Sequence, residues 1–298
     1  PNMNIQLNSD AQTNYSYRSI HNGGSDSANV GQPSMAVADN GTTATINIFG
    51  VSYFANIQAE EKLVYTSSVQ QNSAGTGNPP ARTEVASKWA NTSNSISSIN
   101  HVNLDSGHDF ASGSEVVVLG WDPADTHTTN FWEELDSKTV SSGKSLYTNV
   151  FTPKKYLWVQ AWGKFGSANG APTIQVGNTT IDTGSSYASR YSSNGVANSA
   201  APNGSNIDIA TAFIGAGGTF FLNIFIVNDA SKEKLMIWET SFSSSETAPP
   251  SGGSATAPVR REGVSKWVNT SDQINIIRIW NNSSGDYSDG QITVWGSD

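Results

Sequence analysis

Ser87-Lys88-Trp89-Ala90-Asn91-Thr92-Ser93 recurs 178 positions later as Ser265-Lys266-Trp267-Val268-Asn269-Thr270-Ser271. Further upstream, residues 15–23 and 187–195 share Tyr, Arg, Asn and Gly at the same offsets, and both stretches are followed by a Glu-Lys-Leu triplet. A period this long exceeds the roughly 20 to 50 residues of solenoid repeats. The repetition therefore predicts two tandem domains of one fold.

The composition predicts an all-β chain. Of 298 residues, 36% are hydrophobic, 14% are charged, 27 are Gly and none is Cys. Ser, Thr and Asn are abundant, and these side chains compete with helical backbone hydrogen bonds but suit turns and the solvent face of strands. The aromatic fraction of 10% is enough to fill two sandwich cores.

Short β-rich runs alternate with Gly and Pro turns, a pattern typical of antiparallel sandwiches. We expect two tandem, jelly-roll-like β-sandwiches, with an immunoglobulin-like sandwich as the second choice. The predicted domains span 1–122 and 123–298, and 123–150 serves as linker and entry segment of the second. Each copy ends with a short apolar stretch that lies between two glycines. Residues 115–119 and 291–295 are therefore both predicted to be strands.

The two copies differ in length at their N-terminal ends. The second copy has about two strands' worth of sequence before Tyr187 that the first lacks before Tyr15. A sandwich without those strands exposes an unpaired edge and an uncovered apolar face. One hypothesis is that a neighbouring chain or another protein completes the first domain by strand addition or edge packing. The alternatives are a smaller sandwich that closes on its own and a chain shortened from a longer one.

Net charge and hydropathy argue against nucleic acid and membrane as partners of the chain. The net charge is −9, the pI is near 4.8, and no cluster of basic residues is present to bind phosphates, so we expect no nucleic-acid partner. We also expect no membrane span, because no run of about 18 apolar residues occurs. No cofactor-binding motif is apparent.

Each copy carries a polar cluster before its repeated Trp. The residues are Arg82, Glu84 and Lys88 in the first copy, and Arg260, Glu262 and Lys266 in the second. Charged groups beside an indole can form a platform for a sugar. The competing and favoured interpretation places Trp89 and Trp267 in the core or at its rim, with the following Asn capping a turn.

A second candidate surface lies on residues 156–163. There Trp158, Gln160 and Trp162 alternate with apolar residues, so the three side chains share one face of a strand. An outward orientation predicts an interface or a carbohydrate surface. An inward orientation makes them core residues, which the polar composition elsewhere favours.

Catalytic patterns are not apparent. The histidines do not correspond between the copies, and no carboxylate pair recurs in both with the neighbours that a glycosidase needs. His101, His108 and Asp109 are the best candidates for a metal site, and a surface-loop location without metal is favoured for them. We therefore expect a non-enzymatic protein with no metal site.

Several sequence segments resemble those of a known group of proteins. They are Phe131-Trp132-Glu133-Glu134-Leu135, Lys154-Lys155-Tyr156-Leu157, Ser186 to Gly195, Lys266 to Ile274 and Gly285 to Gly290. Together they are similar to a domain common in predicted virion proteins of marine tailed bacteriophages. The resemblance covers most of the chain and carries no catalytic residues. It implies a capsid-decorating, fibre or other virion surface protein, made in the host cytoplasm and extracellular once assembled.

Two functions are thus expected. The first is a structural virion protein that forms homo-oligomers and contacts a viral shell or a neighbouring virion protein through sandwich edges and loops. The second is a lectin-like module or adhesin that binds glycans or a receptor through aromatic faces. The repeat favours the first and the 9 Trp residues favour the second.

Overall fold

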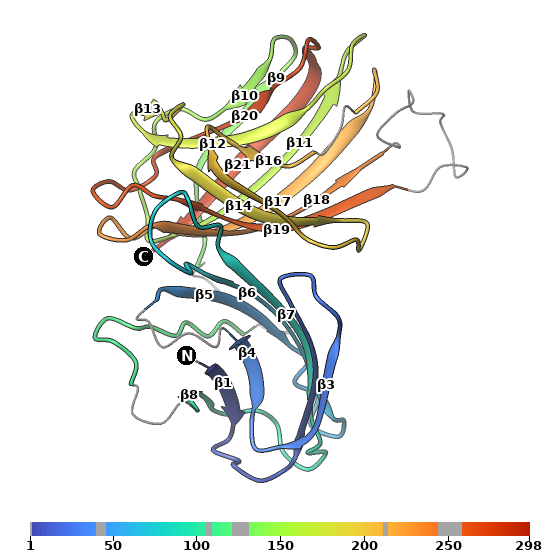
Figure 1. Ribbon diagram of the computed structural model, residues 1–298, viewed down its shortest axis with the longest axis vertical. Helices are drawn as coiled ribbons and strands as arrows, with labels where there is room; N and C mark the ends of the chain where they lie inside the picture. Colours follow the sequence, from blue (N-terminus) through green and yellow to red (C-terminus); the bar gives the residue numbers. More distant parts are fainter. Residues whose placement is uncertain (1, 40–45, 105–108, 121–130, 211–213, 244–257) are drawn as a thin grey trace.

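The computed structural model describes residues 2–39, 46–104, 109–120, 131–210, 214–243 and 258–298 (Figure 1). In these ranges all regular secondary structure consists of β-strands, and neighbouring strands are always antiparallel. The predicted all-β, sandwich-like class is confirmed. A helix long and apolar enough to cross a bilayer is not found in the described residues.

The first eight strands pair only with one another and form the N-terminal half, drawn in blue to green (Figure 1). Their bounds are β1 (Asn2–Leu7), β2 (Tyr15–His21), β3 (Ser27–Gln32), β4 (Met35–Asp39), β5 (Ile48–Phe54), β6 (Lys62–Gln70), β7 (Ala81–Trp89) and β8 (Ile99–Asn103). One sheet has the order β3-β2-β7-β6-β5 and the other β4-β1-β8. Leu7, Met35 and Trp89 are among the core residues between them.

The remaining strands form the C-terminal half. They are β9 (Glu133–Val140), β10 (Ser145–Tyr147), β11 (Tyr156–Phe165), β12 (Pro172–Asn178), β13 (Thr180–Ile181), β14 (Tyr187–Ser193), β15 (Ser199–Gly204), β16 (Ile207–Asp208), β17 (Thr219–Val227), β18 (Lys234–Phe242), β19 (Val259–Trp267), β20 (Ile276–Asn281) and β21 (Tyr287–Ser297). The larger sheet has the order β15-β14-β19-β18-β17-β11-β21-β9. The smaller contains β10-β20-β12-β13, and β16 also pairs with β12.

The halves share a pattern of strand pairing. The order β3-β2-β7-β6-β5 repeats as β15-β14-β19-β18-β17, and β4-β1-β8 repeats as β16-β12-β20. The C-terminal half then adds β11, β21 and β9 beyond β17, and β10 beyond β20. In the described residues the N-terminal half has no strand that corresponds to β9, β10 or β11. The predicted boundary between 122 and 123 lies outside the described residues, whereas β9 and β10 lie within the predicted entry segment.

The strand predicted at residues 115–119 is not found. Glu115 to Leu119 pair with no strand in the described residues, although the matching residues 291–295 lie in β21. In the C-terminal half, β21 is hydrogen-bonded to β11 on one side and to β9 on the other. The N-terminal half has neither neighbour in its described residues, so the apolar sequence has no ladder to join. The prediction was wrong because strand formation depends on partners as well as on sequence.

The apolar face expected to be uncovered is instead closed by β4. On β5 the inward positions that correspond to Leu222 and Ile224 are Gly50 and Ser52. A Cβ on Gly50 would lie 3.4 Å from Val37 Cγ1, and Ser68 Oγ donates to the Val37 carbonyl at 2.8 Å. Small residues therefore let β4 approach the large sheet, as expected of a smaller sandwich, while the backbone edge of β5 pairs with no strand in the part of the chain that the structure describes.

A buried tyrosine connects the two sheets in each half. The Tyr15 hydroxyl accepts from Leu7 N at 2.9 Å and donates to the Asp10 carbonyl at 3.0 Å. The Tyr187 hydroxyl makes the same bonds to Val176 N and to the Asp182 carbonyl. Both rings are fully buried, and burial raises the pKa of Tyr15 to about 12. These hydrogen bonds explain why Tyr recurs at this offset.

The repeated Trp side chains are core residues, as the favoured interpretation predicted. Trp89 and Trp267 are nearly fully buried, and their indole Nε1 atoms donate to Asp10 Oδ2 and Asp182 Oδ2 at 2.8 Å. Partial burial raises the pKa of the Asp182 carboxyl, but hydrogen bonds from Trp267, the Gly184 amide and Ser186 outweigh it and leave the pKa below its ordinary value. The Asn two residues after each Trp caps a turn, since Asn91 Oδ1 and Asn269 Oδ1 each accept from two backbone amides.

We predict that Asp182→Asn destabilises the protein at neutral pH by about 1 to 3 kcal/mol, because it weakens the three charge-assisted hydrogen bonds from Trp267, the Gly184 amide and Ser186. A carboxylate with a lowered pKa in the folded state stabilises the fold above the unfolded pKa of 3.8 and loses this contribution as pH falls through the lower folded value. The two unfolding free energies should therefore converge below pH 3.8 in urea titrations. A difference that stays constant with pH would contradict this assignment.

Candidate assembly surfaces

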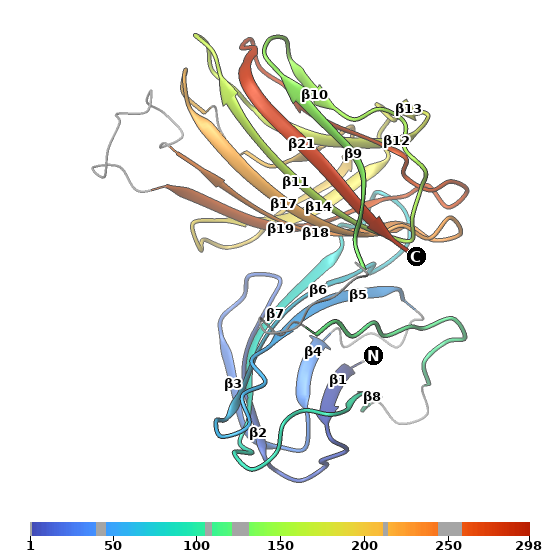
Figure 2. The same ribbon diagram turned by 180° about the vertical axis from the view of Figure 1, so that it is seen from behind.

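The outer faces of the two large sheets meet at a junction between the halves (Figures 1 and 2). Val69 of β6 packs with Leu235, Ile237 and Val264 of β18 and β19, and Phe49 and Val51 of β5 lie against this cluster. These residues point away from the cores of their own halves. The junction is thus a sheet-to-sheet contact with its own apolar centre.

A buried ion pair lies beside that apolar centre. Lys266 Nζ is 3.1 Å from Glu233 Oε2, and the two side chains are 0% and 4% exposed. Residues 71–76 of the N-terminal half cover the pair. Lys266 Nζ donates to the Gln71 and Ser73 carbonyls, while Glu233 accepts from Gln71 Nε2 at 2.8 Å and from Gly75 N at 2.7 Å. Each charge therefore has polar partners from both halves, which burial of an ion pair requires.

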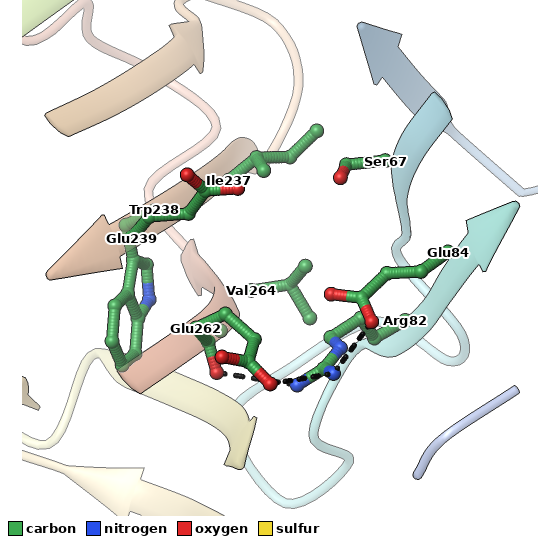
Figure 3. A pocket seen from close by; sticks show the side chains of 9 residues that line it. Ser67, Arg82, Glu84, Ile237, Trp238, Glu239, Glu262 and Val264 are labelled. Atoms are coloured by element: carbon green, nitrogen blue, oxygen red, sulfur yellow. Dashed lines mark hydrogen bonds and ion pairs between the residues drawn. The ribbon is translucent and has the colours of Figure 1, made fainter. Parts of the chain in front are cut away.

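Arg82 makes a second polar contact across the junction (Figure 3). Its NH2 atom lies 3.0 Å from Glu84 Oε2 and 3.5 Å from Glu262 Oε1, and its NH1 atom donates to the Glu262 carbonyl at 3.2 Å. Glu239 lines the same small pocket. Burial and the nearby carboxylates of Glu84 and Glu262 raise the pKa of Glu239. Arg82 thus compensates part of a negative cluster formed by both halves.

The predicted polar patch is not one exposed surface. Arg82, Glu262 and Lys266 are buried at the junction, and Glu84 contacts Arg82 there. Lys88 lies elsewhere and pairs with Glu61 at 2.9 Å, with side chains 43% and 41% exposed. Arg260 pairs with Glu262 from the rim. Because the Trp side chains beside these residues are buried, the sugar-platform interpretation of the six residues is wrong.

The Trp158, Gln160 and Trp162 face points outward, against the favoured core interpretation. Leu157, Val159 and Ala161 fill the core instead. Trp158 is partly buried because its ring lies 4.7 Å from Trp295 and 6.0 Å from Phe225, measured between ring centroids. Its Nε1 donates to Asn223 Oδ1 at 2.6 Å. Aromatic neighbours on the large sheet, and not the sandwich core, cover this tryptophan.

Trp162 is the more accessible of the two indoles. It is 39% exposed, and Phe221, directly opposite on β17, is 46% exposed. Both rings line an open depression with Phe242, Ser243 and Pro258. Of the three predicted contact residues, Trp162 is therefore the one best placed to meet a ligand or partner.

A third surface is the free edge of the N-terminal half. Strand β5 pairs with β6 on one side and with no strand on the other in the described residues. Residues 116–119 are a separate apolar stretch that is strongly exposed, with Val116 at 52%, Val117 at 41%, Val118 at 64% and Leu119 at 55%, while Glu115 before them is ion-paired with Lys155 of the C-terminal half. An unpaired edge together with exposed β-branched residues is a surface suited to association.

Sequence reasoning missed the partners of the repeated lysines. Lys62 and Lys234 are fully buried, and each Nζ donates to three backbone carbonyls. Glu233 at the junction was also missed. The repeated Glu-Lys-Leu triplet was the available signal, because polar residues retained at matched positions of two copies suggest a shared contact. The triplet does not reveal that only one of the two glutamates is buried.

In the described ranges, no three His, Asp or Glu side chains are grouped as metal ligands, and His108 lies outside those ranges. His101 lies in β8 and not in a surface loop, and burial lowers its pKa. No protein-family model, curated protein or solved structure matches the chain.

We predict that Lys266→Met costs about 3 to 5 kcal/mol of stability, because it leaves the Glu233 carboxylate buried without its cation. Lys88→Met is the matched control. It breaks the corresponding pair where both side chains are exposed and should cost about 0 to 1 kcal/mol. Chemical denaturation of both variants measures the difference. Equal small losses would show that the junction pair contributes no more than its exposed counterpart.

Proposed function

We propose that this chain is a non-enzymatic structural protein of a virion surface, either a capsid-decorating or a fibre component of a bacteriophage. The observation that carries the assembly role is the edge of β5, which pairs with no strand in the described residues, together with the exposed apolar residues 116–119. Such a surface is costly for a free chain in water and favourable when another polypeptide covers it. The partners proposed are further copies of the chain and a viral shell or neighbouring virion protein.

Two further features support an architectural role. The junction supports it, because there two sheet faces pack against each other through an apolar centre and a buried ion pair. The net charge of −9 disfavours binding to nucleic acid. The virion location itself rests on the sequence resemblance described above. In that location the chain would be made in the host cytoplasm and displayed outside cells.

Mass spectrometry of gradient-purified virus particles from the source tests the proposal. We expect this chain among the particle proteins. A copy number near that of the major shell protein indicates a decorating component, and a few dozen copies indicate a fibre or collar. The same measurement on the unpurified lysate is the control. Detection in the lysate but not in particles would contradict the virion role.

Binding of a glycan is the second candidate, favoured by the exposed Trp162 and Phe221 beside an open depression. Aromatic faces of this kind can stack on a sugar ring. Trp162→Ala should then abolish saccharide binding on a glycan array with little loss of stability. Trp158→Ala is the comparison variant, since it removes a ring packed against Trp295 and Phe225 and should lower stability. An array without any saturable signal would eliminate this candidate.

A further inference from the structure

The C-terminal half shows how the free edge of β5 can be filled. Strand β17, which corresponds to β5, is followed in its sheet by β11 and then by β21. Residues 115–119 correspond to 291–295 of β21. Of this three-strand arrangement, the N-terminal half therefore has the first strand and an apolar stretch that corresponds in position to the third. The middle strand is missing from its described residues.

Residues at matching positions of the two halves differ in solvent exposure, as expected if a strand is missing beside residues 115–119. Ile292 and Val294 of β21 are 0% exposed, whereas Val116 and Val118 at the matching positions are 52% and 64% exposed. In β21, both residues lie in the ladder with β11, where Val294 is opposite Val159 and Ile292 is opposite Ala161. Exposure of the corresponding valines is thus associated with the missing strand, and not with a more polar sequence.

We propose that the N-terminal half binds one extended strand from a partner protein, antiparallel to β5, in the position that β11 occupies in the C-terminal half. The inference deepens the assembly role proposed above, because it specifies the edge, the register and the chemistry of the partner. Main-chain hydrogen bonds to β5 supply affinity, and alternate side chains supply specificity. Residues 115–119 then pair with the far side of the incoming strand.

The β17–β11 register predicts the side chains that the partner strand presents. Trp158 lies opposite Phe225, whose counterpart is Tyr53, a residue 55% exposed on the outer face of β5. An aromatic residue is therefore expected opposite Tyr53. The inward positions opposite Ser52 and Gly50 correspond to Val159 and Ala161. Small or β-branched apolar residues suit these positions because β4 already fills the space behind Gly50.

A partner protein is a better source of this strand than β11 of a second copy. Strand β11 is paired along nearly its whole length with β17 on one side and β21 on the other. To donate it, a second copy would have to break both ladders and open the larger core of the molecule, which contains Leu157 and Val159. An extended segment with no competing ladder avoids that cost.

A fluorescent peptide with the sequence of residues 154–166 is a suitable probe of the full-length chain. Fluorescence anisotropy should show saturable binding, and hydrogen exchange should slow about tenfold in β5 and in residues 115–119. A peptide with Pro at the positions of Val159 and Ala161 is the peptide control, because Pro cannot extend a ladder. It should not bind.

Val118→Lys should weaken peptide binding about tenfold or more, because it places a charge against the incoming strand. Val196→Lys is the matched control, since Val196 is 62% exposed and lies in the β14–β15 turn of the other half. Equal affinity of the two variants, or protection outside β5 and residues 115–119, would overturn the proposal. Protection of β5 in dimers formed without peptide would also overturn it, in favour of a second copy as occupant.

Absence of the chain from virus particles removes the virion role alone, whereas failure of the peptide to bind removes the strand site alone.

Discussion

The buried contact between Lys266 and Glu233 is the constraint on which the relation of the two halves depends. Two ions removed from water are stable only if every donor and acceptor has a partner. Here residues 71–76 of the N-terminal half provide those partners from their backbone and from Gln71. The loop must therefore keep a defined conformation, and it holds the end of β6 against β18. The apolar contact around Val69 follows from that placement.

The same residue pattern has two different outcomes in this chain. Glu61 and Lys88 form the counterpart of the buried pair, but theirs remains half exposed and is expected to contribute little to stability. Strand β5 likewise corresponds to β17. Among the described strands, however, β5 is the last of its sheet, whereas β17 has β11 as its next neighbour. Local contacts within the two halves are thus alike, as in the hydroxyl bonds of Tyr15 and Tyr187, while the surroundings of the halves differ.

Much of the fold could be predicted from the sequence, because local signals agree with it. Repeated motifs, Gly and Pro turns and alternating residues predicted an antiparallel β architecture, buried Trp89 and Trp267, and the capping Asn. The failures share one physical cause, which is that strand pairing and burial depend on distant neighbours. Residues 115–119 have the composition of a strand but pair with no strand among the described residues. The polar composition of the chain favoured a core position for Trp158, but the rings that cover it come from strands far apart in sequence. The polar clusters likewise could not reveal which half covers the other.

The position of β1 and β21 within their sheets has a mechanical consequence. Strand β1 is flanked by β4 and β8, and β21 is flanked by β11 and β9, so neither is an edge strand. Tension applied through these strands must shear two hydrogen-bonded ladders at once, whereas an edge strand can be peeled away one bond at a time. Force directed along β1 or β21 is therefore resisted by both ladders of that strand together.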